Sequence, residues 1–450
     1  MRRAGWNLVL SFGGRMQFKN IKNLILGVAT AMLASACSTP CDAPGGLCAP
    51  ITSVTSAPPA VAKAPRPKPP APPPEPEVVV ETFSVPSPED AARPPSIMQV
   101  VPQAAEKADG ERVYRIALLL PLRSEALGRA ADALRAGFMA ALERDSHGFE
   151  VNVVETGDSP QEVLSAYVTA QEKNDMVVGP LARSAVTAIA SSPLVEKPTI
   201  ALNHPELRGD PQLPPQMLAI GLSIEDEARQ VAEWGARENP SAKALVISGN
   251  SSWQKRIAGA MSAQLQRLGL RPRNVDLTPF NGYLQDSELV ALRTRLQSEP
   301  AGVLFAALDP DQVRQLKIAL SAPPLGDIPL YGTSSLNPGR SMYRAGPELD
   351  GVRLLDLPWL VQRDHPAVMT YPQPVPRDEA RISADMERVY ALGIDAFRIA
   401  REIAIQPQRR FQLDGVTGQL IIDFGTGPSW FERAEVPAEY RNGVPVPITQ

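Results

Sequence analysis

The 450-residue sequence predicts an α/β protein with two doubly wound lobes. Two observations lead to this prediction. From residue 111 to the C-terminus, short apolar runs alternate with longer amphipathic segments, which is the pattern of βα units. These units fall into two sets, and about 340 residues are enough for two domains of ordinary size. Two sets of crossovers predict two parallel sheets, each covered by helices.

The first set starts with a run of buried-strand type at residues 113–120, which Pro121 ends. Residues 126–145 then repeat apolar side chains at helical spacing. The set continues with a strand at 151–154, a helix at 161–173, a strand at 176–178, a helix that opens near Arg183 and a strand at 198–202.

The second set follows a helix at about 225–238. It comprises strands at 244–247, near Val275, at 302–306 and at 329–331, and helices at 252–268, 286–297 and 309–320. Asp309 before Pro310 is a typical helix N-cap. Asp414-Gly415 and residues 425–427 have the turn chemistry that flanks a hairpin.

The N-terminus has the pattern of a lipoprotein signal peptide at residues 1–36. Lys19 and Lys22 form a basic region, residues 24–33 are apolar but too short for a permanent span, and small residues precede Cys37. We expect cleavage before Cys37 and lipidation of its thiol. The alternatives are an uncleaved anchor helix or a plain secretory signal. Translation from Met1 or from Met16 remains open, and Met16 gives a signal of ordinary length.

A lipid on Cys37 would determine the cellular compartment in which the protein is held. Each buried methylene contributes about 0.8 kcal/mol of membrane affinity, so a multiply acylated cysteine is a permanent anchor. Ser38 follows at the position where inner-membrane lipoproteins of enteric-type bacteria tend to carry Asp. The predicted location is therefore the periplasmic face of the outer membrane.

The proline-rich composition of residues 37–110 predicts a disordered tether. Proline fixes φ and removes amide donors, so the run at 65–76 favours an extended polyproline II spacer. At about 3.1 Å per residue, the roughly sixty residues from 49 to 110 would reach on the order of 150 to 190 Å if fully extended. One interpretation is a tether that lifts the globular domain from the outer membrane into the peptidoglycan. The alternative is a passive linker.

Composition excludes several classes of function. The net charge is −4 with scattered basic residues, which argues against nucleic acid as a partner. The chain after Cys48 has no cysteine, and the three histidines do not lie at ligand spacing, so we expect neither a metal site nor a cofactor. In an oxidising compartment Cys41 and Cys48 could close a small local loop.

No catalytic motif is present. The sequence lacks a Gly-x-Ser-x-Gly elbow, a His-Glu-x-x-His pair, a phosphate loop and a Gly-x-Gly-x-x-Gly run. The carboxylate pairs Asp309/Asp311 and Glu225/Glu227 are interpreted as solvated helix starts. We therefore expect that the protein is not an enzyme.

Several motifs resemble, in order, a known family. They are Tyr114-Arg-Ile-Ala-Leu-Leu-Leu-Pro-Leu122, Ala133-Leu-Arg-Ala-Gly-Phe138, Val177-Val-Gly-Pro-Leu181, Pro198-Thr-Ile-Ala-Leu-Asn203, Leu330-Tyr-Gly-Thr-Ser-Ser335, residues 388–400 and Leu413-Asp-Gly-Val-Thr-Gly-Gln-Leu420. Over residues 113–427 the chain resembles the penicillin-binding protein activator lipoproteins. The resemblance implies a type I periplasmic-binding-protein fold with a cleft between the lobes. It also implies an outer-membrane lipoprotein that stimulates a peptidoglycan synthase. The best-known members carry a helical-repeat domain where this chain has its proline-rich segment.

In doubly wound lobes, ligands meet the loops at the carboxyl ends of the strands. The candidate residues for the interlobe cleft are Leu122, Ser124, Gly179, Leu181, Ser184, Asn203, Tyr331 and Ser334. Residues 179–184 also open a helix whose amides could hold a carboxylate. Alternatively, Gly179 shapes a turn and Ser184 caps the helix, His204 is a surface-loop histidine, and Tyr331 and Trp359 belong to the core.

Two functions remain from different classes. The first is an outer-membrane lipoprotein that binds and regulates a peptidoglycan synthase. The alternative is a periplasmic protein that binds an amino acid, an amide or a cell-wall fragment in the cleft. A cleft filled by side chains would favour the first, and an open polar cleft the second. The identity of the synthase and the oligomeric state stay open.

Overall fold

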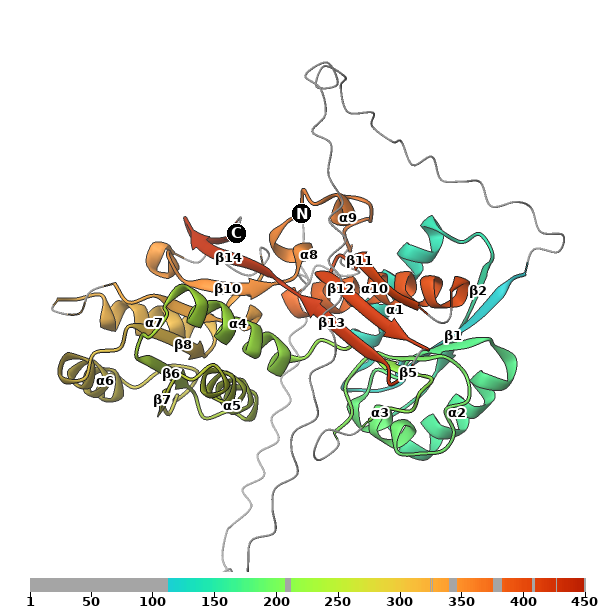
Figure 1. Ribbon diagram of the computed structural model, residues 1–450, viewed down its shortest axis with the longest axis horizontal. Coiled ribbons are helices and arrows are strands. Elements are labelled where there is room, and N and C mark those ends of the chain that lie inside the picture. Colours follow the sequence, from blue (N-terminus) through green and yellow to red (C-terminus); the bar gives the residue numbers. More distant parts are fainter. Residues whose placement is uncertain are drawn as a thin grey trace, which may run out of the picture. The chain divides into compact units, whose positions relative to one another are not determined.

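The computed structural model describes residues 112–206, 212–323, 325, 327–339, 346–374, 383–406, 409–425 and 427–448. They form two α/β lobes and a small antiparallel sheet where the lobes meet (Figure 1). The predictions for the signal peptide, lipidated Cys37, the Cys41–Cys48 loop and the tether concern residues outside the described part of the chain.

Lobe 1 is built on a five-stranded parallel sheet in the order β2-β1-β3-β4-β5. Its elements are β1 (Tyr114–Leu120), α1 (Gly128–Arg144), β2 (Phe149–Glu155), α2 (Pro160–Lys173), β3 (Met176–Val178), α3 (Arg183–Ala190), β4 (Thr199–Ala201), β5 (Met217–Ala219) and α10 (Ala384–Ile405). Successive strand residues point to opposite faces. Leu118 therefore packs with α1 and α10, and Leu119 packs with α2 and α3.

Lobe 2 contains a seven-stranded sheet in the order β15-β14-β10-β9-β8-β6-β7. Its elements are α4 (Ile224–Glu238), β6 (Ala244–Ser248), α5 (Ser252–Arg267), β7 (Arg273–Asp276), α6 (Asp286–Ser298), β8 (Val303–Ala307), α7 (Pro310–Leu320), β9 (Leu330–Gly332), β10 (Arg353–Asp356), β14 (Val436–Arg441) and β15 (Val444–Pro447), with short 3₁₀ turns η2 (Ser334–Leu336) and η3 (Pro347–Leu349). The strands β6 to β10 are parallel, and β14 and β15 add an antiparallel edge. α4 and α5 cover one face of this sheet, and α6 and α7 cover the other.

The chain passes between the lobes three times. The first crossing joins β5 to α4, the second runs from β10 through α8 (Pro358–Val361) and α9 (Pro366–Met369) to α10, and the third joins β13 to β14. The small sheet consists of β11 (Arg409–Asp414), β12 (Gln419–Phe424) and β13 (Trp430–Ala434), and β13 also contacts β5. These crossings bring distant parts of the sequence together at the junction of the lobes.

The predicted α/β architecture is confirmed, and every strand and helix expected in the two sets is present. Asp309 caps α7, with its Oδ1 accepting from the Gln312 amide at 3.0 Å. The predicted hairpin is the pair β11–β12. The strands β5, β10, β13, β14 and β15 were not predicted, because they lie outside the regular strand–helix alternation of the two sets. Among the described helices, none has both the length and the apolar composition that crossing a membrane requires.

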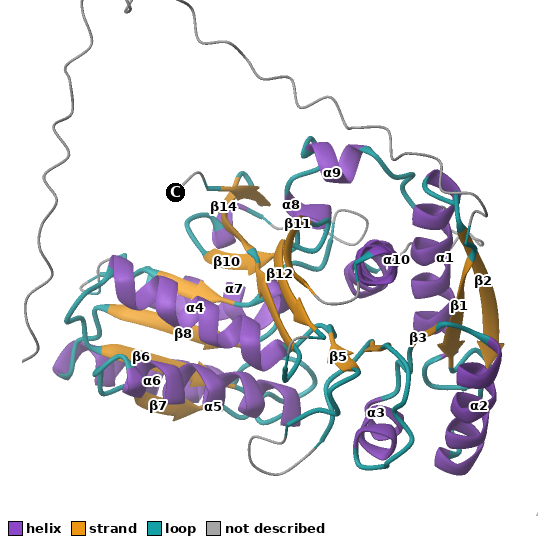
Figure 2. Cartoon of the chain, turned by 45° about the vertical axis from the view of Figure 1, so that its right-hand side comes forward, coloured by secondary structure: helices purple, strands orange, loops and turns teal. Residues whose placement is uncertain are grey.

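Two glycines allow α1 and α10 to lie in close contact (Figure 2). A Cβ atom on Gly137 would lie 1.9 Å from the Tyr390 carbonyl oxygen, and one on Gly393 would lie 2.1 Å from the Leu134 carbonyl oxygen. The same interface contains an edge-to-face contact between Phe138 and Phe397, whose ring centroids are 5.3 Å apart. Only glycine permits the two backbones to approach this closely. The contact fixes α10, which carries the chain's second crossing back into lobe 1.

Candidate functional site

A cavity of about 630 Å³ lies where the carboxyl edge of the lobe 2 sheet meets the crossing segments. The first turns of α4, α5 and α7 border it from lobe 2, and the first turn of α10 borders it from lobe 1. Apolar side chains such as Ile257, Leu357 and Val389 form most of its wall. We call it the hinge cavity. Its place at the carboxyl ends of parallel strands is the usual place for a ligand in this architecture.

A buried ion pair forms the floor of the hinge cavity. The Arg388 guanidinium of α10 donates to both carboxylate oxygens of Asp356, at 3.0 and 2.8 Å, and to the main-chain carbonyls of Ser334 and Asn337, each at 2.9 Å. The Asn337 amide also donates to Asp356 at 2.7 Å. A buried charge pair of this kind is stable only when its remaining donors and acceptors are satisfied, as they are here. The network links the end of β10, the turn after β9 and the start of α10.

Glu227 lies in the first turn of α4 and is buried, with 5% of its surface exposed. Its carboxylate accepts from the Ser334 amide, and from the Ser334 hydroxyl at 3.0 Å. Burial, assisted by repulsion from Asp356, raises its pKa to about 7, although the bonds from Ser334 and the charge of Arg388 act in the opposite direction. The prediction that Glu225 and Glu227 form a solvated helix start is wrong for Glu227, because η2 folds over it.

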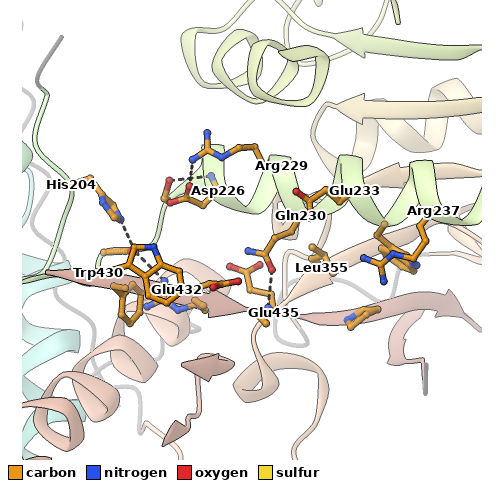
Figure 3. A pocket seen from close by; sticks show the side chains of 17 residues that line it. His204, Asp226, Arg229, Gln230, Glu233, Arg237, Leu355, Trp430, Glu432 and Glu435 are labelled. Carbon is orange, nitrogen blue, oxygen red and sulfur yellow. Dashed lines mark hydrogen bonds and ion pairs between the residues drawn. The ribbon is translucent and has the colours of Figure 1, made fainter. Parts of the chain in front are cut away.

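Glu435 occupies the third crossing and borders the hinge cavity from the other side. Its backbone amide donates to the Gln230 side chain at 3.1 Å (Figure 3). Its Oε2 atom is sealed from solvent, and among the described residues it has no hydrogen-bond partner. Burial and then repulsion from Glu227 raise the pKa of this carboxyl well above its ordinary value. Glu227 and Glu435, whose burial disfavours the charged form of both carboxyl groups, thus border the same cavity.

Arg433 of β13 joins two of the crossings. Its buried guanidinium donates to the carbonyls of Ile220 at 2.8 Å and Gly221 at 3.0 Å, and to the Thr417 hydroxyl at 3.1 Å. Thr417 in turn donates to Asp395 of α10, from its amide at 2.8 Å and its hydroxyl at 2.7 Å. These bonds tie the segment after β5 to β13 and, through Thr417, to α10. The junction between the lobes is thus cross-linked by side chains.

A second cavity of about 610 Å³, the outer cavity, lies between α4 and β13 (Figure 3). Charged side chains of α4, among them Asp226, Arg229 and Glu233, border it. His204 lies at one end, half-buried, with its Nε2 3.2 Å from the Gly221 carbonyl. Burial lowers the pKa of this imidazole, so it is neutral at physiological pH. Glu435 borders both cavities.

The predicted lobe 1 residues lie at the carboxyl edge of its sheet, as expected from the strand order. Leu181 and Asn203 come together, since the Asn203 amide donates to the Leu181 carbonyl at 3.1 Å. The Ser124 hydroxyl accepts from the Leu127 amide at 2.9 Å, and Leu122 packs against the core. The lobe 1 candidates Leu122, Ser124, Gly179, Leu181, Ser184 and Asn203 border neither cavity, whereas His204, next to Asn203, borders the outer cavity.

Other predicted residues have local structural roles. Gly179 is buried with φ at +124°, and a Cβ there would lie 2.1 Å from the Leu119 carbonyl oxygen. Ser184 is exposed inside α3 and makes no cap, so the alternative that it caps the helix is wrong. Tyr331 and Trp359 are fully buried. The Tyr331 ring packs edge-to-face on Trp234, and its hydroxyl donates to Glu238 at 2.5 Å.

Of the predicted cleft residues, Ser334 borders the hinge cavity, and so does its neighbour Ser335. The side chains that define the chemistry there are Glu227, Asp356, Arg388 and Glu435, which the sequence did not single out as a site. They come from α4, β10, α10 and the third crossing, which are far apart in the chain. No local spacing could have indicated that they meet. Among the described residues, no group of three or more His, Cys, Asp and Glu side chains is placed to hold a metal ion.

Comparison with known proteins assigns the family. Residues 101–443 match a family model described as "LppC putative lipoprotein". Two curated relatives are both named penicillin-binding protein activator LpoA. The protein from Photobacterium profundum is 26% identical over 343 residues, covering 68% of this chain and 53% of that protein. The protein from Aliivibrio fischeri is 26% identical over 345 residues, covering 69% and 54%. The chain thus spans about half the length of the curated relatives it matches.

Solved structures share the fold. The C-domain of LpoA from Haemophilus influenzae, described as a regulator of PBP1A, has a TM-score of 0.57 at 22% identity, covering 74% of this chain and 100% of that chain. A structure named for a branched-chain amino acid ABC transporter of Chromobacterium violaceum has a TM-score of 0.59 at 32% identity, covering 73% and 100%. The two-lobed architecture is therefore of the periplasmic-binding-protein kind. Because the family model spans most of the chain and both lobes, the protein belongs to the LppC lipoprotein family.

Proposed function

We propose that this protein is a lipid-anchored regulator of a penicillin-binding peptidoglycan synthase. The observation that carries the proposal is the relationship to two proteins named penicillin-binding protein activator, over a length of chain that matches the two-lobed domain. Those relatives are named as activators and not as enzymes, and the sequence has no catalytic motif, so we further propose that the protein acts by binding.

The proposal includes the membrane anchor and the tether. Residues 1–36 would be the signal peptide, Cys37 would carry the lipid on the periplasmic face of the outer membrane, and residues 37–110 would span toward the inner membrane. In cells grown with labelled palmitate, we expect the wild type to carry the label and a Cys37→Ser variant to carry none. Labelling of that variant would refute lipidation at Cys37.

The regulatory activity is tested with the purified full chain and the bifunctional synthases of the same bacterium. Glycan polymerisation by a detergent-solubilised synthase is measured with and without equimolar protein. We expect faster polymerisation with the wild-type chain and with Cys37→Ser alike, because the lobes and not the lipid contact the enzyme. In cells, only the wild type should be recovered with the synthase after crosslinking. Deletion of residues 49–110 should abolish that recovery while leaving the activation in detergent intact.

If the protein neither binds nor stimulates the synthase in detergent, the proposed regulation is refuted. The deletion variant could instead stimulate the synthase in detergent and also be recovered with it from crosslinked cells. That result would support regulation of the synthase but refute a spanning role for the tether.

The alternative, a small-molecule binding protein, has a specific observation in its favour. The hinge cavity has an ordinary size for a small ligand, and the related transporter structure has the same fold. However, the one Lys or Arg side chain among the described residues of its wall is Arg388, which Asp356 already neutralises. Thus, among these described residues, no free side-chain cation is placed to hold the carboxylate of an amino acid. We therefore prefer regulation as the main function.

A further inference from the structure

One edge of the lobe 1 sheet is open. β2 is the terminal strand of that sheet, and among the described strands it pairs with β1 alone (Figure 2). Directly after β2, the Thr156 amide donates to the Leu120 carbonyl of β1 at 2.9 Å. Successive residues of a strand direct their backbone groups to opposite sides, so those of Val151 and Val153 point away from β1. The edge therefore presents backbone donors and acceptors that no described strand uses.

β2 also lacks the features that usually protect such an edge. Its pairing with β1 continues through all seven residues without a bulge, and it contains neither proline nor lysine. Val153 remains 39% exposed. A cavity of about 810 Å³, the edge groove, is bordered by Asn152 and Val154 of β2 and by Ala166 and Thr169 of α2. A long strand with an open edge and a groove beside it is suited to pairing with one more strand.

A segment of this chain outside the described residues has the composition of a strand. Residues 78–85 are Val-Val-Val-Glu-Thr-Phe-Ser-Val, and they lie between Pro76 and Pro86 in the proline-rich part of the sequence. Six of these eight residues are Val, Thr or Phe, which are enriched in strands. The segment is also long enough to match the seven residues of β2. Its own composition thus favours a strand where the prolines around it do not.

The connection to β1 allows this segment to reach the open edge. β1 and β2 are parallel, and Tyr114 pairs with Phe149, so both strands begin at the same end of the sheet. A strand added beside β2 would lie two strand spacings, or about 10 Å, from β1. Residues 86–113 join the segment to β1 and can extend to on the order of 90 Å. Because the segment is linked to the lobe, its effective concentration exceeds that of a second copy of the chain in dilute solution.

We propose that residues 78–85 form a sixth strand of the lobe 1 sheet, antiparallel to β2. The antiparallel direction brings the end of the segment close to the start of β1, which gives the shortest connection. The proposed tether would then join the side of lobe 1, and its free part would end at residue 77. This inference does not depend on the proposed regulation of a synthase, and its test uses no synthase.

The side chains of the two strands are compatible in this arrangement. An antiparallel register can place Phe83 opposite Val151, which is a favourable pair of an aromatic and a β-branched residue. Glu81 then lies opposite Val153, so no carboxylate lies directly opposite another. Side chains on one face of the new strand would enter the edge groove beside α2.

The test is amide hydrogen exchange of the full chain, purified in detergent micelles, measured by mass spectrometry at the resolution of single residues. The amides of Val151 and Val153 report on the edge, and we expect both to be protected in the wild type. The variant Val80→Pro/Phe83→Pro removes one amide donor from each side of the segment. We expect it to accelerate exchange at both reporter amides by at least about tenfold, and to leave the amides of β1 unchanged.

Ile97→Pro/Val100→Pro is the matched control, because it places two prolines at the same spacing in another apolar stretch of the same region. We expect this control to exchange like the wild type, and unchanged exchange in β1 shows that lobe 1 of each variant is folded. The proposal is overturned if the reporter amides exchange freely in the wild type, if Val80→Pro/Phe83→Pro keeps their protection, or if the control loses it. Protection that rises with protein concentration would also overturn it, because a second copy of the chain would then cover the edge.

Discussion

Replacing Gly137 by alanine tests how tightly the fold holds α10 against α1. The added Cβ would lie 1.9 Å from the Tyr390 carbonyl oxygen and 2.8 Å from its carbon. Both are backbone atoms of α10, so no side-chain rotation relieves the overlap. An ordinary contact requires about 3.4 Å, and the helices must therefore separate by roughly 1.5 Å. The separation would loosen the whole interface, including the Phe138–Phe397 contact.

Two opposing effects set the magnitude. Overpacking of a core contact costs about 1–3 kcal/mol, and this overlap lies at the severe end because it involves two backbones. Alanine in place of glycine inside a helix contributes up to about 1 kcal/mol in the opposite direction. We therefore expect Gly137→Ala to lower the free energy of unfolding by about 2 kcal/mol.

The measurement is thermal and urea unfolding of the full chain, followed by circular dichroism. Gly259→Ala is the matched control. It is also a helical glycine, but a Cβ there would have no heavy atom within 4 Å, so we expect a stabilisation of about 0.5–1 kcal/mol. If Gly137→Ala is as stable as the wild type, or gains stability as Gly259→Ala does, the close approach of the two backbones is not as described.

Three further predictions concern the junction of the lobes. Arg388→Leu should destabilise the fold by about 3–5 kcal/mol, because Asp356 loses its buried partner. The double variant Arg388→Leu/Asp356→Leu should regain a large part of this stability, measured by urea unfolding. An equal loss of stability in both variants would contradict the prediction. The pKa of Glu227 is about 7 in the folded protein against an ordinary 4.5, so the folded state holds the proton more tightly. The free energy of unfolding should therefore fall by up to about 3 kcal/mol as the pH rises from about 4.5 to 7. Glu227→Gln should flatten this pH dependence, and an unchanged dependence would mean that other groups cause it. Arg433→Lys keeps the charge but cannot reach all three of its acceptors, so it should cost about 1–3 kcal/mol, and faster hydrogen exchange at residues 220–223 would report the loosened crossing.

The parts of the fold that follow local rules could be predicted from the sequence. Residues 116–120 of β1 and residues 303–307 of β8 are buried on both faces, so their apolar runs were recognisable. The helices between strands carry apolar residues at helical spacing. The N-cap at Asp309 and the hairpin near Asp414 also follow from neighbouring residues alone.

The site could be predicted only in outline. The carboxyl ends of the strands were the right region, and Ser334 borders the hinge cavity. The lobe 1 candidates lie at the equivalent edge of their own sheet but border neither cavity. Glu227 was misinterpreted because a carboxylate in the first turn of a helix is ordinarily solvated. Its burial depends on Ser334, which is more than a hundred residues away.

The sequence by itself determined the α/β class, the two lobes and the order of the elements from β1 to β4 and from α4 to β9, because these depend on periodicity and turn chemistry within short stretches of chain. Only the tertiary structure decided which charges meet at the hinge. Asp356 and Arg388, and likewise Glu227 and Glu435, are brought together by crossings between lobes, and their burial depends on segments that pack over them. Burial and pairing are properties of that three-dimensional arrangement, so they leave no mark in local sequence.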